Sequence, residues 1–121
     1  MNDILIYIGS AVIFLWGLGH IMATKSVIEE FSSVSKDNHR IITMEWIAEG
    51  LTLCFIGIVA FLAANSYGPE RNVVVLACAG MLVALAILSS FTGARTSIIP
   101  MKLCPFVKMT VVILYMLASF L

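Results

Sequence analysis

Charged residues are scarce in this sequence of 121 residues. Only 12% of them are Asp, Glu, Lys or Arg, whereas 61% are hydrophobic and the mean hydropathy is +1.07. An ordinary soluble domain has about 25% charged residues. The net charge is zero, so no basic excess points to nucleic acid as a partner. Only a membrane can solvate so much apolar surface, and the length allows one integral membrane domain, residues 1–121.

Recognisable motifs for catalysis and metal binding are also missing. The sequence has no nucleophile motif and no glycine-rich phosphate loop, and Glu45 and Glu49 lack the Glu-x-x-His spacing of di-iron bundles. Three cysteines without a Cys-x-x-Cys pair are poor material for a disulfide framework or a zinc site. We expect them to be small buried residues: Cys54, Cys78 and Cys104. The sequence therefore predicts no metal and no cofactor.

Four apolar stretches are long enough for helices that cross a bilayer, which need about 20 residues each. They lie at about 4–23, 41–64, 73–94 and 98–121. The first lacks the positive n-region and cleavage site of a secretory signal, so we expect it to stay in the protein as a helix. A turn signal at Gly68-Pro69 and a very short third connection make neighbouring spans antiparallel. This pattern predicts an all-α, antiparallel bundle of four transmembrane helices.

The connection between the first two spans carries helix signals of its own. Apolar residues recur there at helical spacing, with Glu and Ser residues between them: Val27, Ile28, Phe31 and Val34. This spacing predicts a short amphipathic helix that lies at the membrane interface or continues the first span. Residues 35–38 then offer N-cap side chains for the second span.

The start of the fourth helix is open between two alternatives. In one, Pro100 lies in the first turn and Pro105 is internal, where it removes a backbone hydrogen bond and kinks the helix. In the other, the helix begins at Pro105. We favour the kinked version, since such breaks are tolerated where the freed groups line a cavity or find protein partners.

The distribution of Lys and Arg predicts the orientation. Arg71 lies alone on the side of the second connection. The other six basic residues lie on, or closest to, the side of the first and third connections: Lys25, Lys36, Arg40, Arg95, Lys102 and Lys108. The positive-inside rule places that side in the cytoplasm and both termini outside. We expect a multi-pass protein of the cytoplasmic (cell) membrane, with the lipid bilayer as its main partner.

Glu45 and Glu49 in the second span are the best functional clue. An ionised carboxylate at the bilayer centre costs about 2.5–3.5 kcal/mol, so both need partners or a wet cavity. Their i, i+4 spacing puts them on one helical face. The antiparallel topology brings polar residues of the other spans to the same half of the membrane. The sequence therefore predicts a cytoplasm-facing polar pocket formed by His20, Glu45, Trp46, Glu49 and Arg95, with Lys108 as a counter-ion.

Three functions stay open for this pocket. The preferred one is binding or translocation of a small molecule, cation or proton, including a hydrophobic or cationic ligand. A membrane-embedded acid/base enzyme of isomerase type is the second, because two close carboxylates cannot both ionise easily and His20 adds another titrating group. The third is a structural or accessory subunit, in a homo-oligomer or larger complex. Its charges would only form ion pairs: Glu49 with Lys108 and Glu45 with Arg95.

Two short stretches resemble the DoxX-like group of small four-helix membrane proteins. Residues 16–20, Trp-Gly-Leu-Gly-His, match a glycine-rich first span that ends in a polar residue. Residues 49–53, Glu-Gly-Leu-Thr-Leu, match an acidic residue before a glycine-leucine-rich stretch. The resemblance covers the first half of the chain, and the amphipathic first connection and outward termini depart from it. It implies a fold more than a function, since many members lack an assigned activity.

Overall fold

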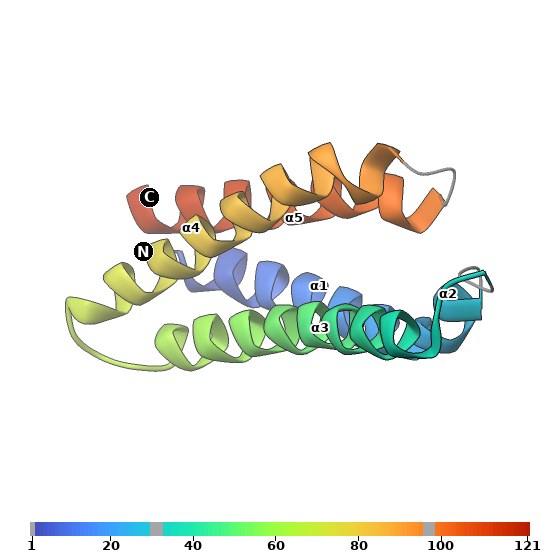
Figure 1. Cartoon of the computed structure of the whole chain (residues 1–121). Helices are drawn as coiled ribbons and strands as arrows, with labels where there is room; N and C mark the ends of the chain where they lie inside the picture. The colour runs from blue at the N-terminus through green and yellow to red at the C-terminus, as the bar shows by residue number, and fades with distance from the viewer. Residues whose placement is uncertain (1, 30–32, 96–98) are drawn as a thin grey trace.

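The computed structural model describes residues 2–29, 33–95 and 99–121, and its helices form two layers (Figure 1). One layer contains α1 and α3, and the other contains α4 and α5. The helices are α1 (Asp3–Met22), α2 (Thr24–Glu29), α3 (Lys36–Ala64), α4 (Glu70–Phe91), the 3-10 helix η1 (Gly93–Arg95) and α5 (Ile99–Phe120). The described residues contain no strand, so the predicted all-α antiparallel bundle with a short helix between the first two spans is confirmed.

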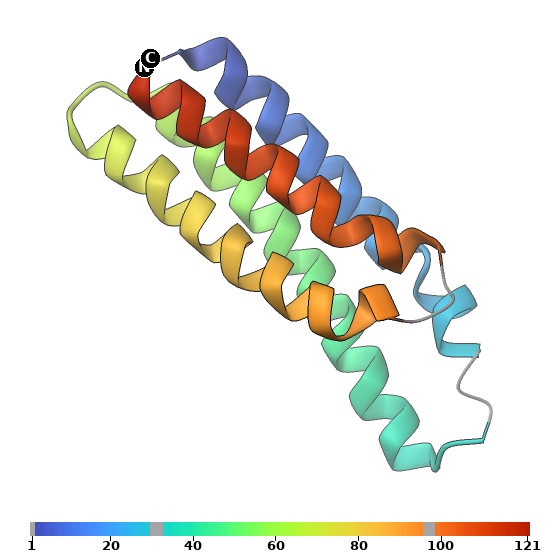
Figure 2. The same cartoon turned by 90° about the horizontal axis from the view of Figure 1, so that it is seen from above.

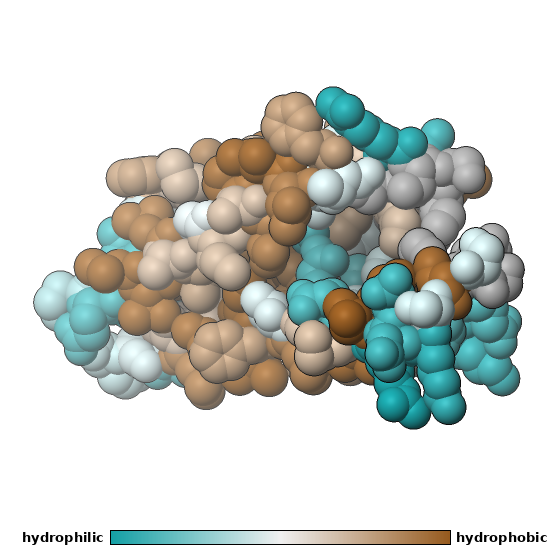
Figure 3. Space-filling model, viewed as in Figure 1, coloured by the Kyte–Doolittle hydropathy of each residue, from teal (hydrophilic) through white to brown (hydrophobic). Residues whose placement is uncertain are grey.

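Four helices in the described part of the chain are long and apolar enough to cross a membrane: α1, α3, α4 and Met101–Phe120 of α5. The space-filling view shows hydrophobic side chains over the middle of the molecule and hydrophilic ones towards its two ends (Figure 3). Large apolar side chains point outward, among them Phe55 and Phe106, which are 65% and 71% exposed. Such a surface suits lipid, and the chain is a multi-pass membrane protein.

The second span begins earlier than the hydropathy predicts. Helix α3 starts at Lys36 rather than at Ile41, because Ser35 caps it. The hydroxyl of Ser35 accepts a hydrogen bond from the backbone N–H of Asn38 at 3.2 Å, which satisfies one of the free donors of the first turn. The first turns of α3 extend beyond the other helices (Figure 2). The predicted N-cap segment is thus confirmed, and the polar residues 36–40 belong to the helix.

The third and fourth spans differ from the prediction only at their ends. Helix α4 stops at Phe91, and the η1 turn continues to Arg95, so the span ends before the predicted residue 94. Helix α5 begins at Ile99 and contains Pro105. The prediction that Pro100 lies in its first turn is therefore confirmed, and the alternative start at Pro105 is wrong.

The predicted amphipathic helix corresponds to α2, which is shorter than its apolar pattern. Val27 and Ile28 are buried, as expected for the apolar face of an amphipathic helix. Phe31 lies outside the described residues. Val34 lies in a bend rather than in a helix, since Ser35 must adopt an extended conformation to cap α3.

Helices α1 and α3 approach closely at two glycines. A Cβ on Gly17 would lie only 2.8 Å from the carbonyl oxygen of Gly50, and a Cβ on Gly50 would lie 3.1 Å from that of Gly17. Small residues allow such contact between membrane helices. Gly17 precedes His20 by three residues and Gly50 follows Glu49, so this contact brings the two polar side chains together.

The half of the bundle near the termini, here called the packed half, is a continuous hydrophobic core. Ile6, Leu53 and Leu82 are fully buried within it. The hydroxyls of Ser10 and Tyr115 share a hydrogen bond at 3.1 Å between α1 and α5. Both termini lie at this end (Figure 2). The opposite half, towards α2 and η1, is the one that carries the polar residues, and we call it the α2 half.

Candidate functional site

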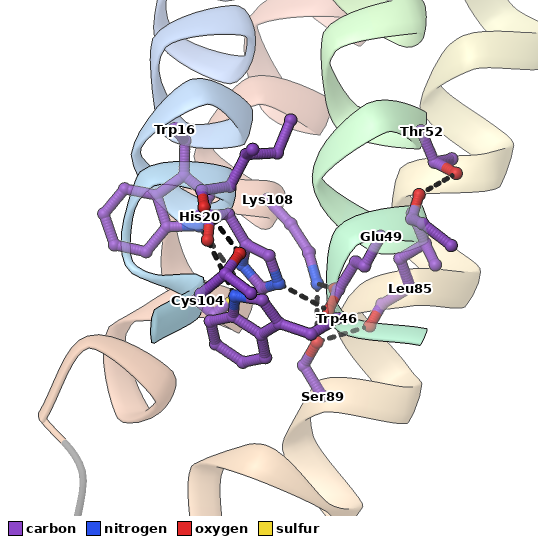
Figure 4. Close-up of polar contacts among 12 residues, drawn as sticks. Trp16, His20, Trp46, Glu49, Thr52, Leu85, Ser89, Cys104 and Lys108 are labelled. Atoms are coloured by element: carbon purple, nitrogen blue, oxygen red, sulfur yellow. Dashed lines mark hydrogen bonds and ion pairs between the residues drawn. The ribbon is translucent and has the colours of Figure 1, made fainter. Parts of the chain in front are cut away.

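An ion pair between α3 and α5 lies at the centre of the site. Lys108 Nζ donates hydrogen bonds to Glu49 Oε1 and, at 2.6 Å, to Ser89 Oγ (Figure 4). Ser89 in turn donates to the carbonyl oxygen of Leu85 at 2.8 Å. Lys108 is fully buried, whereas the Glu49 side chain is 28% exposed. A buried ammonium requires partners of this kind, so the predicted pairing of Glu49 with Lys108 is present and joins three helices.

His20 faces the other carboxylate oxygen of Glu49. Its Nε2 lies 3.4 Å from Oε2, but the geometry makes no hydrogen bond, and this buried nitrogen has no hydrogen-bond partner among the described residues. The imidazole stacks on the indole of Trp46 with ring centroids 3.7 Å apart. Trp46 Nε1 also donates to the carbonyl oxygen of His20 at 2.7 Å, one of the acceptors left free at the end of α1. His20 is therefore held firmly while Nε2 keeps an unused hydrogen-bonding capacity.

The pairing of Glu45 with Arg95 that the sequence suggested is not formed. Glu45 is exposed and has no ion-pair or hydrogen-bond partner in the described ranges. The guanidinium carbon of Arg95 lies over the Phe91 ring, 5.6 Å from its centroid. The short η1 turn places Arg95 above the aromatic residue four positions earlier, where a cation is attracted by the ring face.

A cavity of about 980 Å³ lies beside the ion pair, between the two helix layers. The layers diverge towards the α2 half (Figure 1), and the space-filling view shows the surface hollowed there with hydrophilic side chains in its depth (Figure 3). Most of the lining is apolar. It consists of Val12, Leu15, Trp16, Gly19, His20, Ala23, Val27, Ile41, Ile42, Glu45, Trp46, Glu49, Leu88, Ser89, Thr92, Met101 and Cys104.

The structure brings most of the predicted site residues to this cavity. Those that line it are His20, Glu45, Trp46 and Glu49. Lys108 lies behind Glu49 and is shielded from the cavity, as a counter-ion rather than a wall. Arg95 does not line the cavity, because its side chain lies over Phe91. Four of the predicted residues thus lie around the cavity, whereas Arg95 and Lys108 are not part of its lining.

Three polar or aromatic residues of the site were missed in the sequence. Ser89 accepts a hydrogen bond from Lys108. The signal in the sequence was the pair of adjacent serines, at positions 89 and 90, near the end of an apolar span. Trp16 and Cys104 both line the cavity, and Trp16 Nε1 donates to Cys104 Sγ at 3.4 Å. A tryptophan near a span end reads as an interfacial residue, so no sequence pattern distinguished Trp16 as part of a cavity wall.

Comparison with protein-family models, with curated proteins and with solved structures gives no match to this chain. The resemblance to DoxX-like proteins therefore stays a prediction. Within the described ranges, no group of three or more His, Cys, Asp or Glu side chains could hold a metal ion.

Proposed function

We propose that this membrane protein binds a small, mostly apolar molecule in the cavity of the α2 half. The observation that carries the proposal is a cavity of about 980 Å³ whose apolar lining converges on a few fixed polar groups. Ligand sites are typically clefts of about 300–1,000 Å³ with this combination of walls. The polar group of the molecule would lie against His20 and Glu49. Its apolar part would lie along side chains such as Val12, Ile42 and Leu88.

The residues on the far side of the ion pair favour binding over translocation. Leu53 and Val111 follow Glu49 and Lys108 by about one helical turn, and both are fully buried in the hydrophobic core. Leu82, on α4, is equally buried. The Glu49–Lys108 layer therefore acts as a closed floor beneath the cavity, which suits a binding site better than a continuous path.

The orientation follows from the positive-inside rule and belongs to the same proposal. The α2 half, with six of the seven basic residues, would face the cytoplasm, and both termini would lie outside the cell membrane. A thiol reagent that cannot cross the membrane should label a Ser66→Cys variant in intact cells and leave an Asp37→Cys variant unlabelled. The reverse pattern would contradict this orientation.

Intrinsic fluorescence offers a direct test of binding. The chain has two tryptophans, and both Trp16 and Trp46 line the cavity. A brominated adamantanol, which quenches tryptophan on contact, should quench the protein saturably in lipid nanodiscs. Quenching by probe that is merely dissolved in the lipid is measured with a control, the triple variant Trp16→Phe, Trp46→Phe and Phe106→Trp. The tryptophan of this variant replaces Phe106, whose side chain is 71% exposed. That variant should show quenching without saturation.

Two glycines provide matched variants for this test. A Cβ on Gly19 or Gly80 would meet no atom within 4 Å, so leucine fits at either position without a clash. Only Gly19 lines the cavity. Gly19→Leu should abolish saturable quenching, whereas Gly80→Leu should retain it. Absence of saturable quenching in the wild type, or its persistence in Gly19→Leu, would contradict the proposed site.

Acid–base catalysis on the bound molecule is a second candidate. It is favoured by the 3.4 Å approach of His20 Nε2 to Glu49 Oε2 at the cavity wall, where one group could deliver a proton and the other remove one. An enzyme of this kind would introduce deuterium from D2O into a lipid-derived substrate, and Glu49→Gln would prevent it. Binding without any exchange into a membrane lipid extract would favour the simple binding protein.

A further inference from the structure

We infer that the bound molecule is an amphipathic cation, such as a lipophilic amine, whose ammonium group lies among Glu45, Glu49 and His20. The inference rests on the proposed binding function and adds the charge of the ligand. It requires three properties of the cavity: an unbalanced negative charge, unused acceptors and aromatic walls. Each is present in the described residues.

The charge of the cavity wall is the first argument. Glu45 and Glu49 line the cavity, whereas none of its described lining residues is Lys or Arg. Buried Lys108 compensates Glu49 from behind. Glu45 has no partner among the described residues, and Arg95 is occupied at the Phe91 ring. One carboxylate thus lacks a counter-charge, and a ligand cation would supply it in surroundings less polar than water, where the attraction is stronger.

Unused hydrogen-bond acceptors are the second argument. His20 is only 8% exposed, and its buried Nε2 has no hydrogen-bond partner among the residues that the structure describes. With its proton on Nδ1, the imidazole presents Nε2 as an acceptor beside Glu49 Oε2, 3.4 Å away. A primary ammonium has three N–H donors and can bond both acceptors and a third group. A hydroxyl has one donor, and a carboxylate has none.

The aromatic walls are the third argument. Trp16 and Trp46 both line the cavity, and indole faces attract cations more strongly than other aromatic rings do. Trp46 is fixed by its stacking on His20 and its hydrogen bond to the α1 carbonyl. The exposed basic residues of this end, including Lys25 and Arg40, lie outside the lining, so they do not occupy the site.

A matched set of probes tests the charge directly. Brominated adamantane derivatives that carry an amine, a hydroxyl or a carboxylic acid share one apolar body, and quenching of Trp16 and Trp46 reports their binding. We expect the amine to bind about tenfold more tightly than the alcohol, with the acid weakest. Glu45→Gln should weaken amine binding about two- to fivefold and so reduce the preference for the amine over the alcohol.

Glu70→Gln is the matched control, because it removes the same charge from an exposed site at the opposite end of the bundle. It should keep the full preference for the amine. Thermal unfolding verifies that each variant is folded. Equal binding of amine and alcohol, or an unchanged preference in Glu45→Gln, would overturn the inference and leave the proposed function intact. Failure of all three probes to quench saturably would overturn the proposed function as well.

Discussion

The two halves of the bundle use the same four long helices in opposite ways. In the packed half, Ile6, Leu82 and Tyr115 are fully buried, and the hydroxyl of Tyr115 shares a hydrogen bond with that of Ser10. In the α2 half the layers enclose a cavity, and the buried Nε2 of His20 has no hydrogen-bond partner in the described part of the chain. One end therefore supplies a closely packed core, and the other holds polar groups beside the cavity that we propose as a ligand site.

Side-chain size accounts for much of this difference. In the packed half, Gly9 lies directly against the Tyr115 ring, and Ala60 and Ala79 are almost completely buried. In the α2 half, large side chains such as Trp16 and Trp46 stand beside the cavity instead. Small residues let helices approach closely, whereas bulky and charged ones keep them apart.

Removal of Lys108 should have a large effect on stability. Lys108→Met leaves Glu49 without its counter-ion, and breaking a buried pair on one side costs about 3–5 kcal/mol. We expect a value near the lower end, since Glu49 is 28% exposed. The double variant Lys108→Met, Glu49→Gln should recover most of the loss in the free energy of unfolding measured in bicelles. A double variant as unstable as the single one would show that packing of Lys108, not its charge, matters.

Two leucines on α4 compare the halves directly. Leu82 is fully buried in the packed half, whereas Leu88 lines the cavity and is 59% exposed. Leu82→Ala should lower the free energy of unfolding by about 2–5 kcal/mol, because it leaves a void in a close-packed core. Leu88→Ala should change it by about 0.5 kcal/mol or less, since no packed space is lost. Similar losses at both positions would mean that the cavity half is packed as tightly as the other.

A smaller effect than at Lys108 or Leu82 is expected for the hydrogen bond between Tyr115 and Ser10. Tyr115→Phe should destabilise the bundle by about 0.6–1.7 kcal/mol, the range measured for hydrogen bonds between membrane helices. Ser10→Ala should cost a similar amount, and the double variant should cost little more than either. Strict additivity in this double-mutant cycle would show that the two hydroxyls do not interact.

Topology made part of the site predictable. Short connections enforce antiparallel neighbours, so His20, Glu49 and Lys108 fall at similar depth although they are far apart in the sequence. The pairing of Glu49 with Lys108 could be predicted because the two residues lie at similar depth and because a buried charge is costly without an oppositely charged partner. The capping role of Ser35 and the position of Pro105 inside α5 were likewise readable from local chemistry.

The cavity itself was not predictable in this way. Hydrophobic periodicity identifies spans, but it does not report how far two layers diverge, so apolar lining residues such as Leu88 look like lipid-facing ones. Arg95 escaped prediction for a different reason. A long flexible side chain at a helix end can contact either a carboxylate or an aromatic ring, and Arg95 lies over Phe91, four residues earlier.

The contact between the two ends of the described chain has a topological consequence. The backbone N–H of Asn2 donates to the carbonyl of Ala118 at 2.9 Å, where α1 packs on α5. Helix contacts therefore run in a circuit, from α4 to α5, α1 and α3, and are least extensive between α3 and α4. A circular permutant with these ends joined and the chain opened at Gly68 would keep every extensive contact between successive elements. The α3–α4 seam, which borders the cavity, would then have no covalent link across it.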